Sequence, residues 1–295
     1  MPNSYYFIIN PASLKGNKST EQRIRNFFST RKETFEICYW DTNDNVSDLV
    51  SKGIELGYTC MVACGGDGTI LQVGRAILNM NTHLGILPLG SGNGIARHFN
   101  ISTELDKALY TLVSHKTQPM DIGKAGKYYF FSNIGFGVEV DFIKAYQKRK
   151  VHGIKGYMIA LITALFGFQY KKFTLQYDDK LLPINPYVFL IANTNEQGYG
   201  ISLTPMAHTN DGELNLLAIP RHSWLQLIYF AICTLFGKPI HSHQKVIHIP
   251  GNYFKLKSEN SPLSFQIDGE FVSIEDDSLE ISVLHNAIEV VGTES

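Results

Sequence analysis

One stretch, CMVACGGDGTILQVG from Cys60 to Gly74, constrains the fold of this chain more than any other. Its apolar run ends in Gly65 and Gly66, which predicts a buried parallel strand that stops at a tight turn. The periodic segment that contains Leu71 predicts a helix directly after the turn. At such a junction backbone N–H groups converge with the helix N-terminus, and glycine lets an anion approach the main chain. The stretch alone is explained equally well by phosphate binding and by a purely structural glycine-rich turn, and the later stretches shift the balance towards phosphate binding.

An acidic residue stands inside this loop. Asp67 lies between Gly66 and Gly68 and is followed by Thr69. A carboxylate at this place can order Mg²⁺, directly or through water, or accept hydrogen bonds in a ribose or phosphate network. The loop thus predicts both a phosphate site and a group that organises it.

Length and composition narrow the class of protein. A chain of 295 residues is long for one hydrophobic core, so two domains are expected. With 26 basic and 27 acidic side chains the net charge is −1, which gives no nucleic-acid-binding footprint. The four cysteines form no CxxC pair, and the first ten residues lack the basic region of a signal peptide. A reducing, cytoplasmic compartment is therefore expected.

The first half of the chain alternates between two periodicities. Strands are expected at 5–10, 34–40, 60–64 and 84–89, with helices between them, one of which starts at Ser19. This order predicts an α/β domain of the Rossmann type, with a parallel sheet and helices on both faces. Ligands of such sheets bind beyond the C-terminal ends of the strands, where Asn10 and both glycine turns fall.

A second glycine loop follows the fourth strand. In PLGSGNGIARHF, Ser91, Gly92 and Asn93 precede another helix start. Two loops on neighbouring strands can hold a nucleotide from both sides, although Ser91 and Asn93 would also suit simple helix capping. Arg97 and His98 are interpreted as surface residues.

From Asp121 onward the pattern changes to short alternating runs. Strands are expected at 128–133, 173–177, 187–192, 213–219, 245–249, 253–257, 263–267 and 278–283. That spacing predicts a mainly β C-terminal domain, an antiparallel sandwich or barrel. We place a nucleotide-binding domain at 1–125 and a β-rich substrate domain at 126–285.

Several blocks in order resemble the diacylglycerol kinase catalytic-domain family, which includes bacterial lipid kinases and sphingosine kinases. The first blocks are NPAS, GGDGT and PLGSGNGIAR, and the later ones include FSNIGFGVEVD, NDGELNL and QIDGE. The resemblance covers nearly the whole chain. It implies an ATP-dependent lipid kinase of two domains, with ATP between them and residues 286–295 returning to the first.

The resemblance also assigns site residues. ATP is expected at Asn10, Gly65, Gly66, Asp67, Gly68, Thr69, Ser91, Gly92 and Asn93. Asp268 matches the residue that the family uses as general base for a lipid hydroxyl, and Glu270 is the alternative acid. On the residues alone a hairpin turn would be preferred here, because Asp-Gly between apolar runs is a strong hairpin signal.

Magnesium is the second expected cofactor. The block around Asp211 matches a structural Mg²⁺ site of bacterial members, with backbone carbonyls such as those of His208 and Glu213 completing the oxygen shell. Asp121 matches an acidic family position in a network of water and Mg²⁺ that links the domains. Gly94 departs from bacterial diacylglycerol kinases, which usually carry Asp there, so a sphingoid base stays open as the acceptor.

Two apolar segments, 156–168 and 224–237, are shorter than the roughly 20 residues that span a bilayer. Lys144, Lys148, Arg149 and Lys150 precede the first segment, and Lys171 and Lys172 follow it. These cations suit transient docking on the inner face of a membrane, whereas packing over the β-domain core explains the apolar pattern equally well. A homodimer is also left open.

Two rival functions are an NAD kinase, which shares GGDGT, and a non-catalytic nucleotide or lipid sensor. No GSTA-like block of NAD kinases is found, and the retained acidic residues argue against a sensor. The pair His241 and His243 is interpreted as surface because no third metal ligand is nearby.

Overall fold

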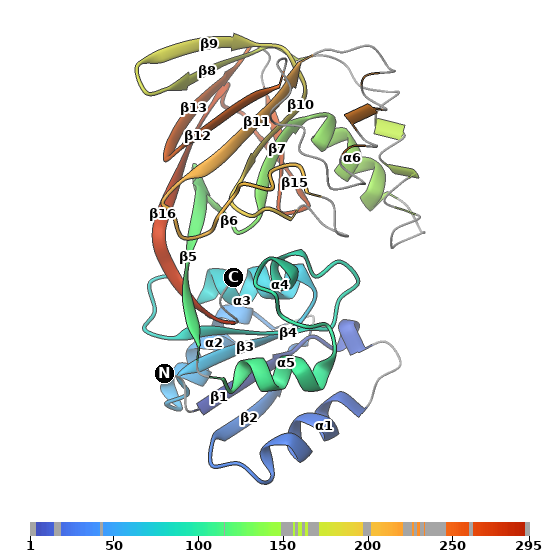
Figure 1. Cartoon of the computed structure of the whole chain (residues 1–295), viewed down its shortest axis with the longest axis vertical. Helices are drawn as coiled ribbons and strands as arrows, with labels where there is room; N and C mark the ends of the chain where they lie inside the picture. Colours follow the sequence, from blue (N-terminus) through green and yellow to red (C-terminus); the bar gives the residue numbers. More distant parts are fainter. Residues whose placement is uncertain are drawn as a thin grey trace. The chain divides into compact units, whose positions relative to one another are not determined.

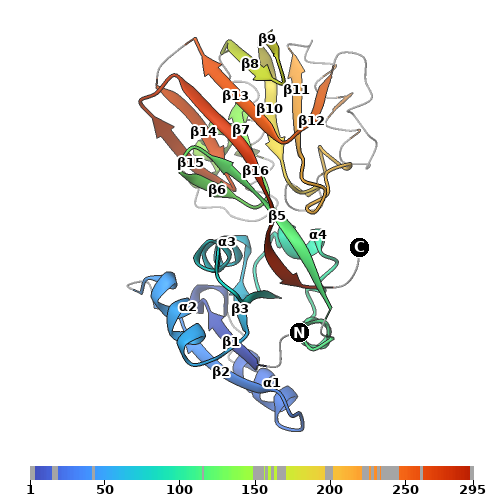
Figure 2. The same cartoon turned by 90° about the vertical axis from the view of Figure 1, so that its left-hand side faces the viewer.

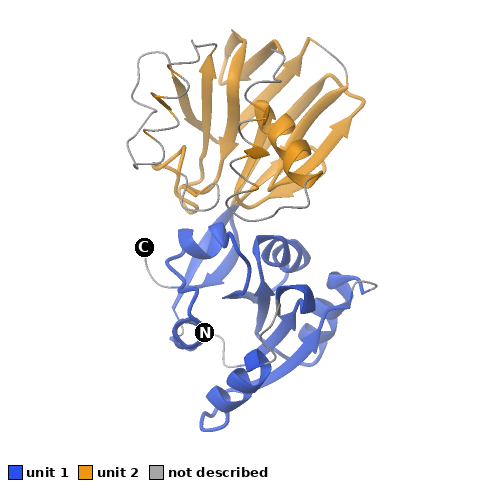
Figure 3. Ribbon diagram, turned by 90° about the vertical axis from the view of Figure 1, so that its right-hand side faces the viewer, with its two compact units in different colours: residues 1–121, 286–295 blue, residues 122–285 orange. Residues whose placement is uncertain are grey.

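The computed structural model divides the chain into two compact units (Figure 3). Unit 1 comprises residues 1–121 and 286–295, and unit 2 comprises residues 122–285. Within these bounds the structure describes residues 4–14, 19–41, 44–114, 116–148, 156, 159–160, 163–164, 171–196, 202–220, 226, 229–230, 233, 246–259 and 262–292.

Unit 1 is built on a parallel sheet in the order β2-β1-β3-β4-β16 (Figure 1). Its strands are β1 (Ser4–Ile9), β2 (Thr34–Tyr39), β3 (Cys60–Gly65), β4 (His83–Pro88) and the end of β16 (Ser278–Val291). Its helices are η1 (Pro11–Leu14), α1 (Ser19–Phe28), α2 (Val46–Glu55), α3 (Asp67–Ala76), α4 (Gly94–His98) and α5 (Leu105–Leu112). The predicted α/β architecture is confirmed.

Helices cover both faces of this sheet, as the residues of β1 make clear. Tyr5 and Phe7 pack against Phe28 of α1, with ring centroids 5.5 and 5.7 Å apart. Tyr6, between them, lies against Gly53 of α2 on the other face, where a Cβ on the glycine would come within 2.8 Å of the ring. Successive strand residues point to opposite faces, so α1 and α2 lie on opposite sides of the sheet. Every residue of β3 is buried, as expected for a central parallel strand.

Unit 2 consists mainly of two antiparallel sheets. The first sheet has the strand order β12-β11-β10-β7-β14-β15 (Figure 2). In the second sheet the first part of β16 pairs with β13, β13 pairs with β8, and β8 pairs with β9. The hairpin of β5 and β6 belongs to this second sheet because β5 pairs with β16. Strand β5 (Thr117–Ala125) begins in unit 1 and enters unit 2 at Ile122. The other strands are β6 (Tyr128–Phe130), β7 (Asn133–Gly137), β8 (Phe173–Tyr177), β9 (Lys180–Ile184), β10 (Pro186–Ala192), β11 (Leu214–Pro220), β12 (Ile247–Gly251), β13 (Tyr253–Ser258), β14 (Leu263–Ile267) and β15 (Glu270–Ile274). The predicted antiparallel β architecture of the C-terminal part is confirmed.

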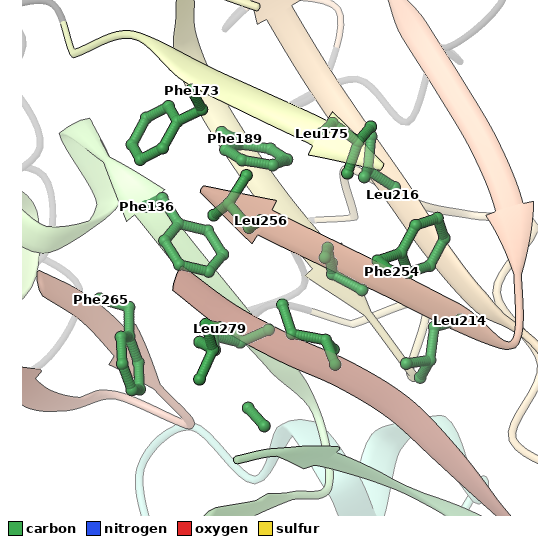
Figure 4. Packing of buried hydrophobic residues seen from close by; sticks show 14 of the residues in the cluster. Phe136, Phe173, Leu175, Phe189, Leu214, Leu216, Phe254, Leu256, Phe265 and Leu279 are labelled. Atoms are coloured by element: carbon green, nitrogen blue, oxygen red, sulfur yellow. The ribbon is translucent and has the colours of Figure 1, made fainter. Parts of the chain in front are cut away.

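Apolar side chains from both sheets form the core of unit 2 (Figure 4). Phe136 of β7 and Phe189 of β10 come from one sheet, and Phe173 of β8 comes from the other. The ring centroids of Phe136 and Phe189 lie 5.1 Å apart, and those of Phe173 and Phe189 lie 5.6 Å apart. One helix, α6 (Val138–Gln147), follows β7 directly and contacts β7, β10, β14 and β15.

Candidate functional site

Hydrogen bonds from Asn10 join the ends of β1 and β3 to the first turn of α3. The backbone N–H of Asn10, after β1, donates to the carbonyl oxygen of Cys64 in β3 at 3.1 Å. The Asn10 side-chain Nδ2 donates to Thr69 Oγ1 at 3.2 Å. Thr69 itself is buried in the first turn of α3 and lies against Gly65, where a Cβ would come within 2.2 Å of Thr69 Oγ1. Asn10, Gly65 and Thr69 therefore fix the path of the first glycine loop.

The two glycine loops pack backbone against backbone. A Cβ on Gly90 would lie 2.4 Å from the Cα of Gly66 and 2.9 Å from Asn93 Oδ1, which no real Cβ achieves. Gly90 must therefore lack a side chain because the first loop occupies that space. The sequence predicted neighbouring loops at one sheet edge, and the structure brings these two into contact.

Asn93 closes the second loop on itself. Its Oδ1 accepts the N–H of Gly90 at 3.0 Å and its Nδ2 donates to the Gly90 carbonyl at 2.8 Å. Asn93 is 3 % exposed, adopts a left-handed backbone with φ 53°, and makes no side-chain cap to α4. The capping alternative therefore does not describe Asn93, whose side chain instead sets the shape of the loop. Ser91 is exposed at the tip, and Arg97 Nε donates to the Gly92 carbonyl at 3.2 Å.

Asp67 connects the first loop to the second. Its Oδ2 accepts the N–H of Gly94 and its Oδ1 accepts the N–H of Ile95, both at 3.1 Å. The carboxylate thus holds the beginning of α4, which follows the second loop. These hydrogen bonds give Asp67 a role that the sequence did not predict, in addition to any contact with a ligand.

The N-terminus of α3 carries the features of an anion site. Gly66 is its N-cap and provides no side-chain hydrogen bond to the first turn. Gly68, one residue into the helix, is exposed, and nothing lies within 4 Å of the position of a Cβ there. Unsatisfied N–H groups and the positive end of the helix dipole favour phosphate at such a terminus.

In unit 2, Asp268 and Gly269 form the two-residue turn between β14 and β15. Both have positive φ, 49° and 84°, which is the geometry that Asp-Gly hairpin turns require. The hairpin interpretation is therefore correct for the backbone. It does not account for the direction of the Asp268 side chain.

Three consecutive backbone N–H groups hold the Asp268 carboxylate. Oδ2 accepts from Phe131 at 2.9 Å, and Oδ1 accepts from Ser132 at 2.8 Å and from Asn133 at 3.1 Å. The Asp268 N–H donates to the Asn133 carbonyl at 3.0 Å. We call residues 131–133, which follow β6 and end with the first residue of β7, the amide cradle. Such charge-assisted bonds stabilise an ionised carboxylate and fix its direction.

Buried amide side chains support the amide cradle. Asn193, fully buried, donates from Nδ2 to the Phe131 carbonyl at 2.9 Å, and its own N–H donates to the Ser132 carbonyl at 2.8 Å. Gln266 reaches both Asn133 and Gly269. Sequence reasoning missed these residues, and their only signal was the occurrence of Asn and Gln within runs of core residues.

Two further carboxyl groups lie near the β14–β15 hairpin. Glu270, the first residue of β15, is exposed. Glu139, in the first turn of α6, is half-buried against Gly135, where a Cβ would come within 2.8 Å of the Glu139 side chain and of Gln266 Nε2. Burial raises the pKa of Glu139 to about 7. Glu139 lies in the FSNIGFGVEVD block, but sequence reasoning did not single it out.

The two remaining acidic candidates each accept a hydrogen bond from a backbone N–H group. Asp121 is fully buried in unit 1, and its Oδ1 accepts the Asn286 N–H at 2.7 Å. Asp211 is exposed, and its Oδ1 accepts the Glu213 N–H at 3.0 Å, which closes a turn. His208 is exposed. Within the described part of the chain, no three His, Cys, Asp or Glu side chains are grouped to hold a metal ion.

Most of the two apolar segments lies outside the described residues, and so do His241 and His243. Ala160 and Ala164 are buried in a cluster with α6, whereas Ile159 is exposed. Phe230 and Cys233 are buried in a cluster with β10 and β11 residues, whereas Tyr229 is exposed. Where described, each segment thus turns one side to the unit 2 core. No helix in the described ranges is long and apolar enough to cross a membrane.

Comparisons with known proteins agree with this two-part architecture. Residues 4–125 match the diacylglycerol kinase catalytic domain, and residues 132–292 match the YegS C-terminal NAD kinase beta sandwich-like domain. A Bacillus subtilis protein named diacylglycerol kinase is 28 % identical over 274 residues, which cover 90 % of this chain and 88 % of that one.

Solved structures share the fold. A putative diacylglycerol kinase from Bacillus anthracis superposes with a TM-score of 0.80 at 17 % identity, covering 99 % of this chain and 98 % of that one. An NAD kinase from Archaeoglobus fulgidus, solved with ATP, gives a TM-score of 0.57 at 12 % identity, covering 98 % and 94 %. The two matching domain models together account for nearly the whole described chain, and the chain is a kinase that belongs to the diacylglycerol kinase catalytic-domain family, with a YegS-type C-terminal domain.

Proposed function

We propose that this kinase transfers the γ-phosphoryl group of ATP to the hydroxyl of a lipid such as diacylglycerol, with Asp268 as general base. The observation that carries the proposal is the amide cradle, which holds the Asp268 carboxylate through three backbone N–H groups. A carboxylate held in this way keeps one direction, which fixes the place from which it can accept a proton from an alcohol.

ATP binds to unit 1 in this proposal. The uncapped N-terminus of α3 and the open position at Gly68 support a phosphate there, and the Asn10, Asp67 and Asn93 side chains hold the surrounding backbone in place. Gly65, Gly66 and Gly92 allow the close approach of the main chain, and Ser91 supplies a hydroxyl at the loop tip. Preformed loops lose little conformational entropy on binding, which favours a nucleotide.

Mg²⁺ enters the reaction as part of the Mg–ATP substrate in this proposal. The carboxylate oxygens of Asp67 accept hydrogen bonds from Gly94 and Ile95, and the described residues contain no cluster of metal-binding side chains. This donor set fits an ion that arrives as Mg–ATP, coordinated by phosphate oxygens and water, better than a protein-built site. Asp67, which is partly exposed, would act on that complex through water, whereas the fully buried Asp121 accepts the N–H of Asn286 and supports the site from within unit 1.

The chemical step uses few protein groups. The lipid oxygen attacks the γ-phosphorus in line, its proton passes to Asp268, and the bond to the β-phosphate oxygen breaks to release ADP. Phosphoryl transfer of this kind depends mainly on positioning and charge neutralisation. Glu270, exposed beside the turn, is the second acid available to the acceptor.

The acceptor is tested directly. Purified protein is incubated with labelled Mg–ATP and, in separate reactions, diacylglycerol, a sphingoid base or NAD, and products are separated by chromatography. Label in phosphatidic acid supports the proposal. Label only in the sphingoid base or only in NADP assigns one of those acceptors, and no lipid-dependent ATP consumption by a folded sample indicates a sensor.

Transient membrane association forms a second part of the proposal. Lys148 and Lys172 are exposed on either side of the first apolar segment, and Lys144 and Lys171 are half-exposed there. Cations beside apolar side chains favour anionic membrane surfaces. Co-sedimentation with vesicles that contain anionic lipid is expected to decline as salt rises, because exposed charges are screened. Absence of vesicle binding at low salt would contradict the proposed membrane association but not the proposed kinase reaction.

A structural Mg²⁺ at Asp211 and a homodimer remain predictions. Asp211 lies in a tight turn with Glu213, where backbone carbonyls of neighbours such as His208 could complete an oxygen shell. Metal analysis of Asp211→Asn against the parent protein tests the ion, and sedimentation of the parent tests the dimer.

A further inference from the structure

The side chain of Gln266 forms hydrogen bonds to Asn133 of the amide cradle and to Gly269 of the turn that carries Asp268. Gln266 lies in β14, two residues before Asp268, and is 3 % exposed. Its Nε2 donates to Asn133 Oδ1 at 2.5 Å, and its Oε1 accepts the N–H of Gly269 at 3.0 Å. We propose that Gln266 is a positioning residue that fixes Asp268 for proton transfer, an inference that rests on the proposed function.

The direction of both amide groups follows from their neighbours. The Gly269 N–H can only donate, so Gln266 must present its oxygen to it and its NH₂ group to Asn133. Asn133 then presents Oδ1 to Gln266, which leaves its Nδ2 to donate to Ser132 Oγ at 3.1 Å. A rotation of either amide would set two donors or two acceptors against each other.

These contacts reach the carboxylate from two sides. Asn133 and Ser132 belong to the amide cradle and donate their backbone N–H groups to Asp268 Oδ1. Gly269 is the other residue of the turn that carries Asp268. Gln266 therefore ties the turn to the cradle, and its loss would let Asp268 move relative to its three donors.

The surroundings of Gln266 argue against a purely space-filling role. Gln266 points to the face of β14 opposite to its strand neighbours Phe265 and Ile267, which lie in the unit 2 core, and it is nevertheless buried. A buried amide costs free energy unless its groups are hydrogen-bonded. A Cβ on Gly135 would lie 2.8 Å from Gln266 Nε2 and also from the Glu139 side chain, so the absence of a side chain at Gly135 makes room for both.

The test uses two substitutions and a matched control in the full-length protein. Gln266→Met keeps the length of the side chain and removes both hydrogen bonds. Ser264→Ala, two residues earlier in β14, removes a different contact across the hairpin, the one between Ser264 Oγ and Ser273 Oγ at 3.2 Å. Urea unfolding checks that each protein is folded, and kcat and KM are measured for ATP and for the lipid that the parent phosphorylates.

We expect Gln266→Met to lower kcat by about tenfold to a hundredfold while both KM values stay within about twofold, because misplacing a catalytic group acts on the transition state. Ser264→Ala should keep the parental kcat. A folded Gln266→Met protein with parental kcat, or with altered KM alone, overturns the inference. If the parent protein itself is inactive, the result contradicts the proposed function. This outcome differs from failure of the inference about Gln266, which requires an active parent protein.

Gln266→Glu gives a second test that does not depend on the Met variant folding. A protonated Glu can donate to Asn133 and accept from Gly269, as Gln does, whereas an ionised Glu can only accept. The kcat of this variant, divided by the parental kcat at the same pH, should fall as the pH rises from 5 to 8. A ratio that does not change with pH overturns the inference.

Discussion

Asp67 Oδ2 lies 3.1 Å from the backbone nitrogen of Gly94, so the acidic residue of the first glycine loop holds the start of the helix after the second loop. The sequence suggested that Gly94 removes a carboxylate from a charged network near ATP. In the structure the backbone of Gly94 provides a donor to the carboxylate of Asp67. Replacing Asp67 should therefore alter the geometry of both loops, whereas any residue except proline at position 94 would still supply this donor.

Asp67→Asn is expected to raise the KM for ATP about tenfold or more and to change the KM for lipid little. The amide has one acceptor oxygen, so either Gly94 or Ile95 loses its partner, and a bond to a charged group contributes roughly 1.5–3 kcal/mol. Steady-state kinetics measure the effect. Asp48→Asn, in the exposed first turn of α2, is the control. An unchanged KM for ATP would contradict the assignment of these loops.

Two glycine substitutions separate loop packing from ligand binding. Gly90→Ala should destabilise the protein, because the new Cβ would lie 2.4 Å from the Cα of Gly66. Gly68→Ala should leave stability equal or higher, because its Cβ meets nothing within 4 Å and alanine favours helix by up to about 1 kcal/mol. Urea unfolding and ATP titration are measured for both. Weaker ATP binding by a stable Gly68→Ala protein would locate phosphate at α3, and full binding would argue against it.

Asp268→Asn should abolish nearly all turnover and also lower the free energy of unfolding. Sequence reasoning predicts the loss of turnover with an intact fold. The amide cradle adds a stability cost, of roughly 1–3 kcal/mol, because an Asn NH₂ group would face a backbone N–H. Turnover and urea unfolding are compared with those of Asp276→Asn, an exposed residue in the same unit. Parental turnover in the Asp268 variant would refute the base assignment.

Stability should depend on pH through Glu139. Its pKa in the folded state is about 7, raised by burial from 4.5, so the folded state binds more protons than the unfolded state between these values. The free energy of unfolding therefore falls as pH rises from about 4.5 to 7, by at most about 3 kcal/mol for this group. Glu139→Gln should reduce that fall and the exposed control Glu55→Gln should not, as measured by urea unfolding at pH 5 and pH 8. An identical fall in all three proteins would show that Glu139 does not titrate in this range.

The elements that sequence reasoning located best have strong patterns. The β3 run before Gly65, and the alternating β8 and β14, agree with their predicted ranges to within one residue. Strand β7 and helix α6 were missed, since Gly135 and Gly137 interrupt the apolar pattern that would have marked them. Strand β16 is also longer than expected, because 278–283 was the only part with clear alternation.

Sequence reasoning could predict the functional side chains of the candidate site but not the backbone groups that hold them. The motif around Asp67 predicts an anion site, and the motif around Asp268 predicts a catalytic acid or base. In the structure both carboxylates accept hydrogen bonds from the backbone. The donors are backbone N–H groups of Gly94, Ile95 and residues 131–133, which any residue type except proline supplies. A sequence cannot identify them until the tertiary fold brings distant segments together.

The last strand of the chain has a consequence for the order in which the protein forms. Residues Glu289 and Val290 of β16 pair in parallel with β4, and Asn286 donates to the buried Asp121. During synthesis the N-terminal residues of unit 1 leave the ribosome first, yet their sheet lacks one strand until β16 has also been made. Unit 1 therefore completes its folding only after unit 2 has been made, so the order of maturation is the reverse of the order of synthesis.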